Sequence, residues 1–256
     1  MLIDSHAHLD APYFRNRLPE VLHRAREAGI EKVITIGVTP SSTKKCMAIA
    51  AKHPSVYATA GYHPHWSNGA GPERLAEIRQ LAGDPSVVAL GEIGLDYHHF
   101  HSPKKDQLDL FRTMLNIAVD VGLPVVIHDR KANNDVYDIL SEFRSKLSGG
   151  IIHCFSGNWH LAKKYLDWGF FLSIPGPVTY PHSRDLREVA QKAPLEHILL
   201  ETDAPHLTPA QRRGKKNEPA FVRYTAEEVA GLRNISLEEV AETTSENVFK
   251  AFKIGL

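Results

Sequence analysis

Eight short apolar runs recur along the 256 residues of this chain, and they constrain its fold more than any other feature. Each run is nearly continuously apolar rather than alternating, which is typical of parallel strands covered on both faces. The runs lie at residues 2–3, 33–36, 56–59, 87–90, 124–127, 150–152, 170–172 and 198–200. They predict eight parallel strands.

Segments with helical spacing of apolar residues separate these runs. The clearest one has Ser102 as a candidate N-cap, Pro103 at the first helical position and Gly122 just past its end. Further helices are expected near residues 19–29, 42–53, 72–82, 133–146, 159–168 and 183–193, and after a capping box at 236–239. This alternation predicts the α/β class and most simply a TIM (β/α)8 barrel, one domain over residues 1–256, although the pattern alone leaves open a doubly wound sheet.

Composition bounds the class of protein. The hydrophobic fraction of 43% is ordinary, and no apolar run approaches the roughly 20 residues that cross a bilayer. Two cysteines cannot build a disulfide framework, and no basic-then-apolar leader follows Met1. We therefore expect a soluble, cytoplasmic protein without a membrane partner. A monomer is a separate expectation. The 30 basic residues balance the 30 acidic ones, which argues against indiscriminate binding to duplex nucleic acid but not against a local basic patch.

Residues of the types that commonly bind metals follow the apolar runs. His6 and His8 come at the end of the first run, and residues two apart on a strand project to the same face, so that both imidazoles can share one ion. The active sites of (β/α)8 barrels lie at the C-terminal ends of the strands. The residues that follow later runs are His63, Glu92, His128, His153 and Asp203. We expect these side chains to converge on a metal site.

Each of these residues also has an ordinary structural explanation. His63 could close a loop, and a substrate-facing role suits it better than coordination. His128 and His153 could be neutral core histidines, and Asp203 could cap the loop that follows it. Glu92 could be a surface carboxylate, but it comes directly after a buried run, where an unpaired charge is costly, so it needs a partner. The agreement between several strand ends favours function over packing.

Six candidate ligands exceed what one tetrahedral zinc ion needs: His6, His8, Glu92, His128, His153 and Asp203. Two divalent ions are the better count, because the carboxylates can bridge or supplement the imidazoles. Two ions roughly 3.5–4 Å apart can hold a hydroxide and bind a phosphate or carbonyl oxygen. The residues therefore predict hydrolysis, and they do not choose among Zn, Mn, Fe and Mg.

The pattern resembles the TatD family of metal-dependent deoxyribonucleases, within the amidohydrolase-like TIM-barrel superfamily. The resemblance spans nearly the whole chain and rests on residues 4–9, 61–65, 91–96, 127–128, 152–157, 200–205 and 213–219. It implies one metal position held by His6, His8, Glu92 and Asp203. The other position would be held by Glu92, His128 and His153, so that Glu92 is the bridge.

The resemblance also implies an activity, the removal of nucleotides from DNA, often 3′ to 5′ on single strands. Three residues would be catalytic: Asp203 would hold the attacking water and act as its base, while Glu201 and His63 fall near the reacting phosphate. An alternative for Glu201 is a support that only orients its neighbours. In this family Glu92 stands where many hydrolases of the superfamily carry a carboxylated lysine.

Substrate contacts are expected from His63, His65, Arg130, Arg213 and Lys216. Arg130 fits the family pattern, and Lys131 departs from it, because an acidic residue often follows the arginine. Lys216 stands where the family often has arginine, which keeps the charge but loses the bidentate fork.

Loops near the predicted site carry further cations and aromatic residues. The four cations at 212, 213, 215 and 216 form either a phosphate-binding rim or a solvated face. Tyr62, Trp66 and Tyr97 could stack bases or only pack loops.

Two other functions stay open at this point. The same pair of ions could serve an amide, lactone or ester hydrolase of small molecules, because a hydroxide held between two metals also attacks carbonyls. The third hypothesis is a non-catalytic binding protein with structural metals. The sequence does not separate DNA from RNA substrates, or exonucleolytic from endonucleolytic cleavage.

Overall fold

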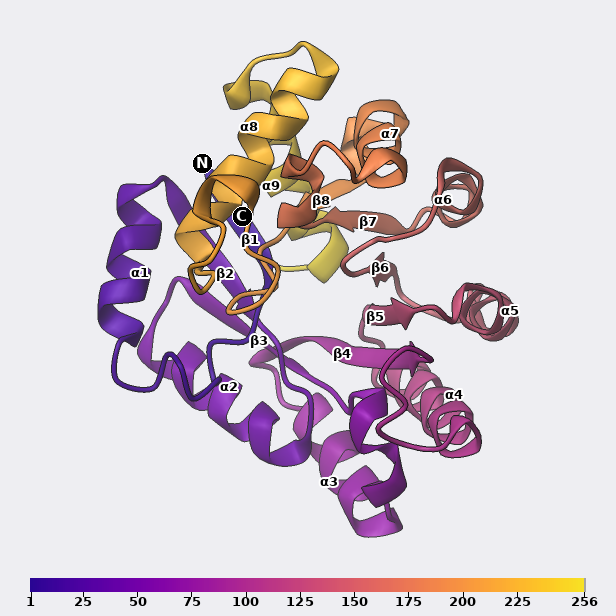
Figure 1. The fold of residues 1–256 in the computed structure, drawn as a ribbon. Helices are drawn as coiled ribbons and strands as arrows, with labels where there is room; N and C mark the ends of the chain where they lie inside the picture. The colour runs from indigo at the N-terminus through magenta and orange to yellow at the C-terminus, as the bar shows by residue number, and fades with distance from the viewer. Residues whose placement is uncertain (256) are drawn as a thin grey trace. The chain divides into compact units, whose positions relative to one another are not determined.

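The structure is a computed structural model that describes residues 1–255. Within these residues eight strands alternate with helices along the chain (Figure 1). The strands are β1 (Leu2–Ala7), β2 (Ile30–Thr35), β3 (Val56–Ala60), β4 (Val87–Asp96), β5 (Val125–Arg130), β6 (Gly150–Ile152), β7 (Phe171–Ile174) and β8 (Ile198–Leu200). All eight apolar runs of the sequence form strands, as predicted.

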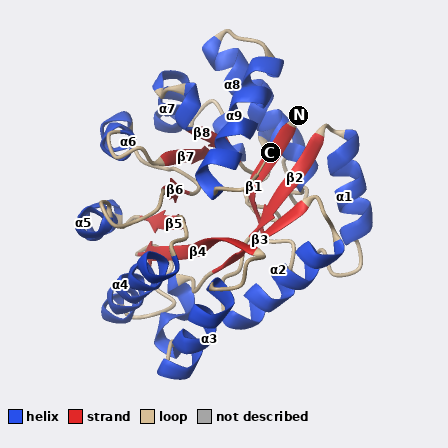
Figure 2. Cartoon of the chain, turned by 180° about the vertical axis from the view of Figure 1, so that it is seen from behind, coloured by secondary structure: helices blue, strands red, loops and turns tan. Residues whose placement is uncertain are grey.

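A helix lies between each strand and the next along the chain, as the apolar spacing predicted, and two more helices follow β8 (Figure 2). They are α1 (Leu18–Glu27), α2 (Pro40–Lys52), α3 (Pro72–Ala82), α4 (Lys104–Val121), α5 (Asn133–Phe143), α6 (Trp159–Leu166), α7 (Arg184–Lys192), α8 (Val222–Arg233) and α9 (Leu237–Phe252). Helix α8 was not predicted; its buried face contains small residues such as Ala226 and Ala230, which give a weak apolar signal. No helix within residues 1–255 is long and apolar enough to cross a membrane.

The strand order identifies the fold class. The strands follow one another as β1 to β8 in one sheet, and the pairs with a resolved register are parallel. The end of β1 also pairs with the segment after β8, through a parallel bridge between Ala7 and Ala204. A doubly wound sheet has a point where strand order reverses, and this sheet has none. The fold is the predicted TIM (β/α)8 barrel.

The chain divides into two compact units, and each has its own buried residues. One unit contains residues 1–35 and those from 154 onward; α8 and α9 pack on β1 and β8, and its buried residues include Ile3, Val33, Leu172 and Val248. The other contains residues 36–153; α2 packs on β3 and α4 on β4, over buried residues such as Leu90, Phe111 and Ile127. A single domain over residues 1–256 stays a prediction.

Strand β4 continues well past the apolar run that predicted it, from residue 90 to Asp96. Gly94 makes this extension possible: it has φ +142°, and a Cβ atom there would collide with the backbone carbonyl oxygen of His128 on β5. The extension includes the polar residues Glu92 and Asp96, which are buried. A rule that ends a strand where apolar residues end therefore misses six residues that carry two buried carboxylates.

Helix α4 starts one residue later than predicted. Pro103 is the N-cap residue and the helix begins at Lys104. Ser102 does not cap the helix; its hydroxyl instead donates to the backbone oxygen of His65, at 2.9 Å. The predicted end is confirmed, because Gly122 takes the left-handed conformation that ends many helices.

Candidate metal centre

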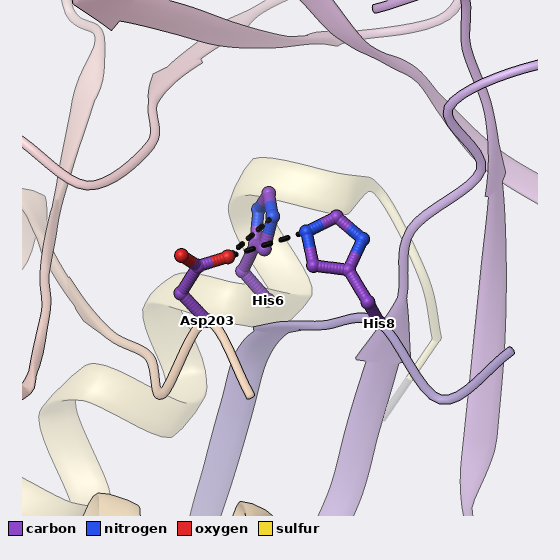
Figure 3. Close-up of side chains that lie close together, drawn as sticks. All are labelled: His6, His8 and Asp203. Carbon is purple, nitrogen blue, oxygen red and sulfur yellow. Dashed lines mark ion pairs between the residues drawn. The ribbon is translucent and has the colours of Figure 1, made fainter. Parts of the chain in front are cut away.

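Three predicted ligands form a donor group in the first unit. His6 lies on β1, His8 just after it, and Asp203 after β8; Figure 3 shows the three side chains pointing toward one another. Asp203 Oδ1 lies 3.2 Å from His8 Nε2 and 3.6 Å from His6 Nε2. One donor atom of each residue lies within 4.8 Å of the other two. The interpretation of His6 and His8 as a pair that acts with Asp203 agrees with this geometry.

Backbone hydrogen bonds fix the relative position of these residues. The N–H of Asp203 donates to the His6 oxygen at 2.9 Å, and the N–H of His8 donates to the Ala204 oxygen at 2.8 Å. The chain after β8 therefore continues the pairing of β1, and this places the Asp203 carboxylate beside both imidazoles. Asp203 has φ +55°, a left-handed conformation that Asp tolerates better than most residues.

Asp4 supports this group through Thr202, the residue before Asp203, a role that sequence reasoning missed. Its buried carboxylate accepts hydrogen bonds from the Thr202 N–H at 2.9 Å and the Thr202 hydroxyl at 2.6 Å. Asn217 donates to the Thr202 oxygen at 2.8 Å. Burial raises the pKa of Asp4 to about 8, although the bonds from Thr202 oppose the shift. The only signal in the sequence was its place beside the histidine pair.

A second donor group surrounds Glu92 in the other unit. Glu92 Oε1 lies 2.7 Å from His128 Nδ1, 3.4 Å from His63 Nε2 and 3.4 Å from His153 Nε2. Glu92 is 3% exposed, and a carboxylate buried to this extent needs partners such as these. The expectation that a buried Glu92 has partners is confirmed. His63, expected to face the substrate, contacts the same carboxylate and is itself a possible ligand.

The pKa values of two imidazoles in the second group are shifted in opposite directions. Burial lowers the pKa of His63 to about 4, so that this imidazole is neutral, the form that binds a metal. Burial also lowers the pKa of His128, but hydrogen bonds with Asp96 and Glu92 outweigh it and raise the pKa to about 10. A metal that binds His128 must displace a proton, which makes its affinity depend on pH.

The other predicted site residues lie in several environments. Glu201 directly follows β8 and is fully buried. Arg130 ends β5, and its side chain is exposed, as are those of Arg213 and Lys216. His65, expected to bind substrate, is partly buried and donates from Nε2 to Asp96 at 2.7 Å. The roles proposed for these residues stay predictions.

Some of the loop cations and aromatic residues pack against protein, and others are exposed. Arg212 lies over the rings of Phe221 and Tyr224, at 5.1 and 5.3 Å from their centroids, so its guanidinium packs on protein. Tyr62 is buried, which leaves no ring face for a base, whereas Trp66 is 55% exposed. Of these residues, Trp66 is therefore the better candidate for base stacking.

The comparisons with known proteins identify the family of this chain. The model of the TatD-related DNase family matches residues 3–253. The chain belongs to this family. The metal-dependent hydrolase YabD of Bacillus subtilis, described as uncharacterized, is 40% identical over 255 residues, which cover 100% of both chains. The crystal structure of YjjV, a TatD homologue from Escherichia coli K12, superposes with a TM-score of 0.92 at 29% identity and covers 99% of this chain and 98% of its own.

A TatD-family relative with a named activity is also similar to this chain. The 3′-5′ ssDNA/RNA exonuclease TatD of Erwinia tasmaniensis is 32% identical over 259 residues, which cover 99% of this chain and 100% of the relative. Together with the family match, these relatives confirm that the chain is a metal-dependent hydrolase of the ester-cleaving type. The interpretation as a non-catalytic binding protein is set aside.

Proposed function

We propose that this protein is a metal-dependent deoxyribonuclease that removes nucleotides from the 3′ end of single-stranded DNA. The observation that carries the proposal is the pair of donor groups, one around Asp203 and one around Glu92, in a chain of the TatD family. The named activity of the Erwinia tasmaniensis relative supports the direction of cleavage and the single-stranded substrate.

Each donor group is proposed to hold one divalent ion, Zn, Mn or Mg. His6, His8 and Asp203 would hold the first, and Glu92, His128 and His153 the second. Imidazole-rich sets favour transition metals, while phosphate oxygens can recruit Mg. When bound, the ions supply Lewis acidity that lowers the pKa of water and neutralises charge on a phosphate. The bridging role of Glu92 stays a prediction.

The protein's own residues would then divide the remaining tasks. Asp203 is proposed to orient the attacking water and take its proton, and its Oδ1 is already fixed beside two imidazoles. His63 and Glu201 are proposed to position the reacting phosphate. The N–H of His65 donates to His63 Nδ1 at 3.1 Å, which directs Nε2 of His63 toward Glu92.

The proposed substrate contacts are cationic and exposed. Arg130, Arg213 and Lys216 would bind backbone phosphates, and the exposed Trp66 would stack a base, an interaction worth about 1–3 kcal/mol. Contacts of this kind do not read sequence, so the proposal predicts little sequence preference.

The test uses single-stranded DNA labelled at either end, with Mg, Mn or Zn added to metal-free protein. Release of the 3′ label as a mononucleotide, with a shortening ladder from the 5′ label, is the expected result. His128→Ala should abolish it, and His23→Gln, on the exposed face of α1, should not. Early internal fragments would contradict the exonuclease direction, and equal cleavage by His128→Ala would contradict the metal site.

A parallel assay covers the small-molecule alternative. A panel of amides, lactones and esters is given to the same protein, because the same chemistry attacks carbonyls. The nuclease proposal predicts negligible turnover of the panel, and a loss of DNA cleavage in Arg213→Ala and Lys216→Ala. Efficient turnover of a panel substrate that these two changes leave unaltered would favour the alternative.

A further inference from the structure

The segment after β4 is rich in histidine. His98, His99 and His101 follow Asp96 within five residues, and His65 comes from the 3-10 turn Pro64–Gly69 after β3. These residues lie outside the proposed ligand sets of the two ions. We propose that His65, Asp96 and His99 form a third metal site that takes Zn or a similar divalent transition ion. This inference does not depend on the proposed nuclease activity.

The three donor atoms already lie together. Asp96 Oδ2 accepts from His65 Nε2 at 2.7 Å and from His99 Nδ1 at 2.9 Å, and the three donor atoms lie within 4.8 Å of one another. Two imidazoles and one carboxylate are a ligand set that zinc commonly binds, with an open position for water. Bonds of 2.0–2.2 Å place zinc ligands roughly 3.3 Å apart, so binding requires the donors to separate by about half an ångström.

The exposure of the ligands permits this movement. Asp96 is fully buried, whereas the side chain of His65 is 25% and that of His99 47% exposed. His99 therefore provides both an entry path and the freedom to adjust, and Asp96 provides the fixed point.

Asp96 is held in place by a shell of its own. Its Oδ1 accepts from the backbone N–H of His98 at 2.9 Å and of His99 at 2.8 Å, which leaves Oδ2 for the imidazoles. Gln107, buried on α4, accepts from the Asp96 N–H at 2.8 Å and donates to the Asp96 and Ser102 oxygens at 3.0 Å each. Supporting hydrogen bonds of this kind orient metal ligands.

His101 is placed to complete the coordination. Its ring centroid lies 4.5 Å from that of His65 and 5.7 Å from that of His99, stacked nearly parallel to the latter. Its side chain is exposed. A third imidazole would close a tetrahedral site and raise its affinity for zinc.

A competing role for Asp96 is purely structural. Its Oδ2 also lies 3.3 Å from Nε2 of His128, so Asp96 could serve only to orient that residue. In that case the imidazoles of His99 and His101 would be dispensable for metal binding. The experiment therefore changes these two exposed residues and leaves Asp96 intact.

Metal-free protein is titrated with Co²⁺ and with Zn²⁺, and bound metal per chain is counted by calorimetry and elemental analysis. The double variant His99→Gln/His101→Gln should bind one equivalent fewer than the unaltered protein and lose part of its Co²⁺ visible spectrum. His98→Gln, in the same loop but outside the donor group, is the matched control and should keep the full count. Circular dichroism checks that the double variant is folded.

The outcomes separate this site from the proposed catalytic ions. The one-equivalent difference should persist when His6→Ala is added to both proteins, whether or not either hydrolyses DNA. A double variant that keeps the full metal count would overturn the proposal. A difference that disappears in the His6→Ala background would overturn it as well, because the loop histidines would then act through the first donor group.

Discussion

His8 Nε2 lies 3.2 Å from the carboxylate of Asp203, although the two residues come from opposite ends of the strand series. The parallel bridge from Ala7 to Ala204 creates this contact, because it aligns the end of β1 with the chain after β8. The proposed first metal position thus depends on the pairing that joins the first strand to the last. Substitutions of His8 or Asp203 should therefore weaken metal binding more than they destabilise the fold.

Asp203→Asn keeps the shape of this side chain and removes its charge and basicity. We expect hydrolysis to fall by about 10²–10⁴-fold, the range for loss of a general base. Rates measured at saturating metal separate the loss of the base from weaker metal binding. A rate within a factor of a few of the unaltered protein would show that Asp203 is not the base.

His6→Ala should empty the first metal position and leave the position of His128 and His153 partly occupied. The reason is that His6 contacts Asp203 and the second donor group has its own carboxylate in Glu92. Bound metal per chain, measured by elemental analysis after dialysis, checks the division. Equal loss at both positions would show that they do not fill independently.

Asp4→Ala should destabilise the protein by about 2–4 kcal/mol, because it leaves the buried N–H and hydroxyl of Thr202 without their acceptor. Urea unfolding of the metal-free protein measures the change without a contribution from bound ions. Asp4→Asn is the control: its amide oxygen can still accept one of the two bonds, so its effect should be smaller. Similar stabilities for all three proteins would contradict the support role of Asp4.

Gly94→Ala should destabilise the protein by about 2–5 kcal/mol, because φ is +142° and the new methyl group would collide with the His128 carbonyl oxygen. The displacement of β5 should also weaken metal binding through His128. Gly83→Ala is the control, since a Cβ there meets only ordinary contacts at 3.5 Å. Thermal unfolding of the two variants makes the comparison, and equal melting temperatures would argue against the close approach of β4 and β5.

The positions that sequence reasoning found share one property, the end of an apolar run. His6, His128, His153 and Asp203 each follow such a run, so alternation and barrel topology were enough to expect them to converge. Within the separate units, the structure brings His6 together with Asp203 and His128 together with Glu92.

What was missed depends on contacts between segments distant in sequence. Asp96 ends the β4 extension, where its buried carboxylate meets three histidines and its N–H meets Gln107. Asp4 precedes the histidine pair on β1, and its role is visible only when Thr202 is placed beside it. Neither relationship has a periodic signal, because each depends on where a hydrogen-bond partner from another segment lies.

The central claim is that the donor groups around Asp203 and Glu92 hold the ions that support DNA hydrolysis. The most direct measurement is the rate of mononucleotide release from 3′-labelled single-stranded DNA as metal is returned to metal-free protein, with bound metal counted in the same samples. We predict no release without metal, a rise as the donor groups fill, and no recovery in Glu92→Ala at any metal concentration. Full release by the metal-free protein, or by Glu92→Ala, would contradict the claim.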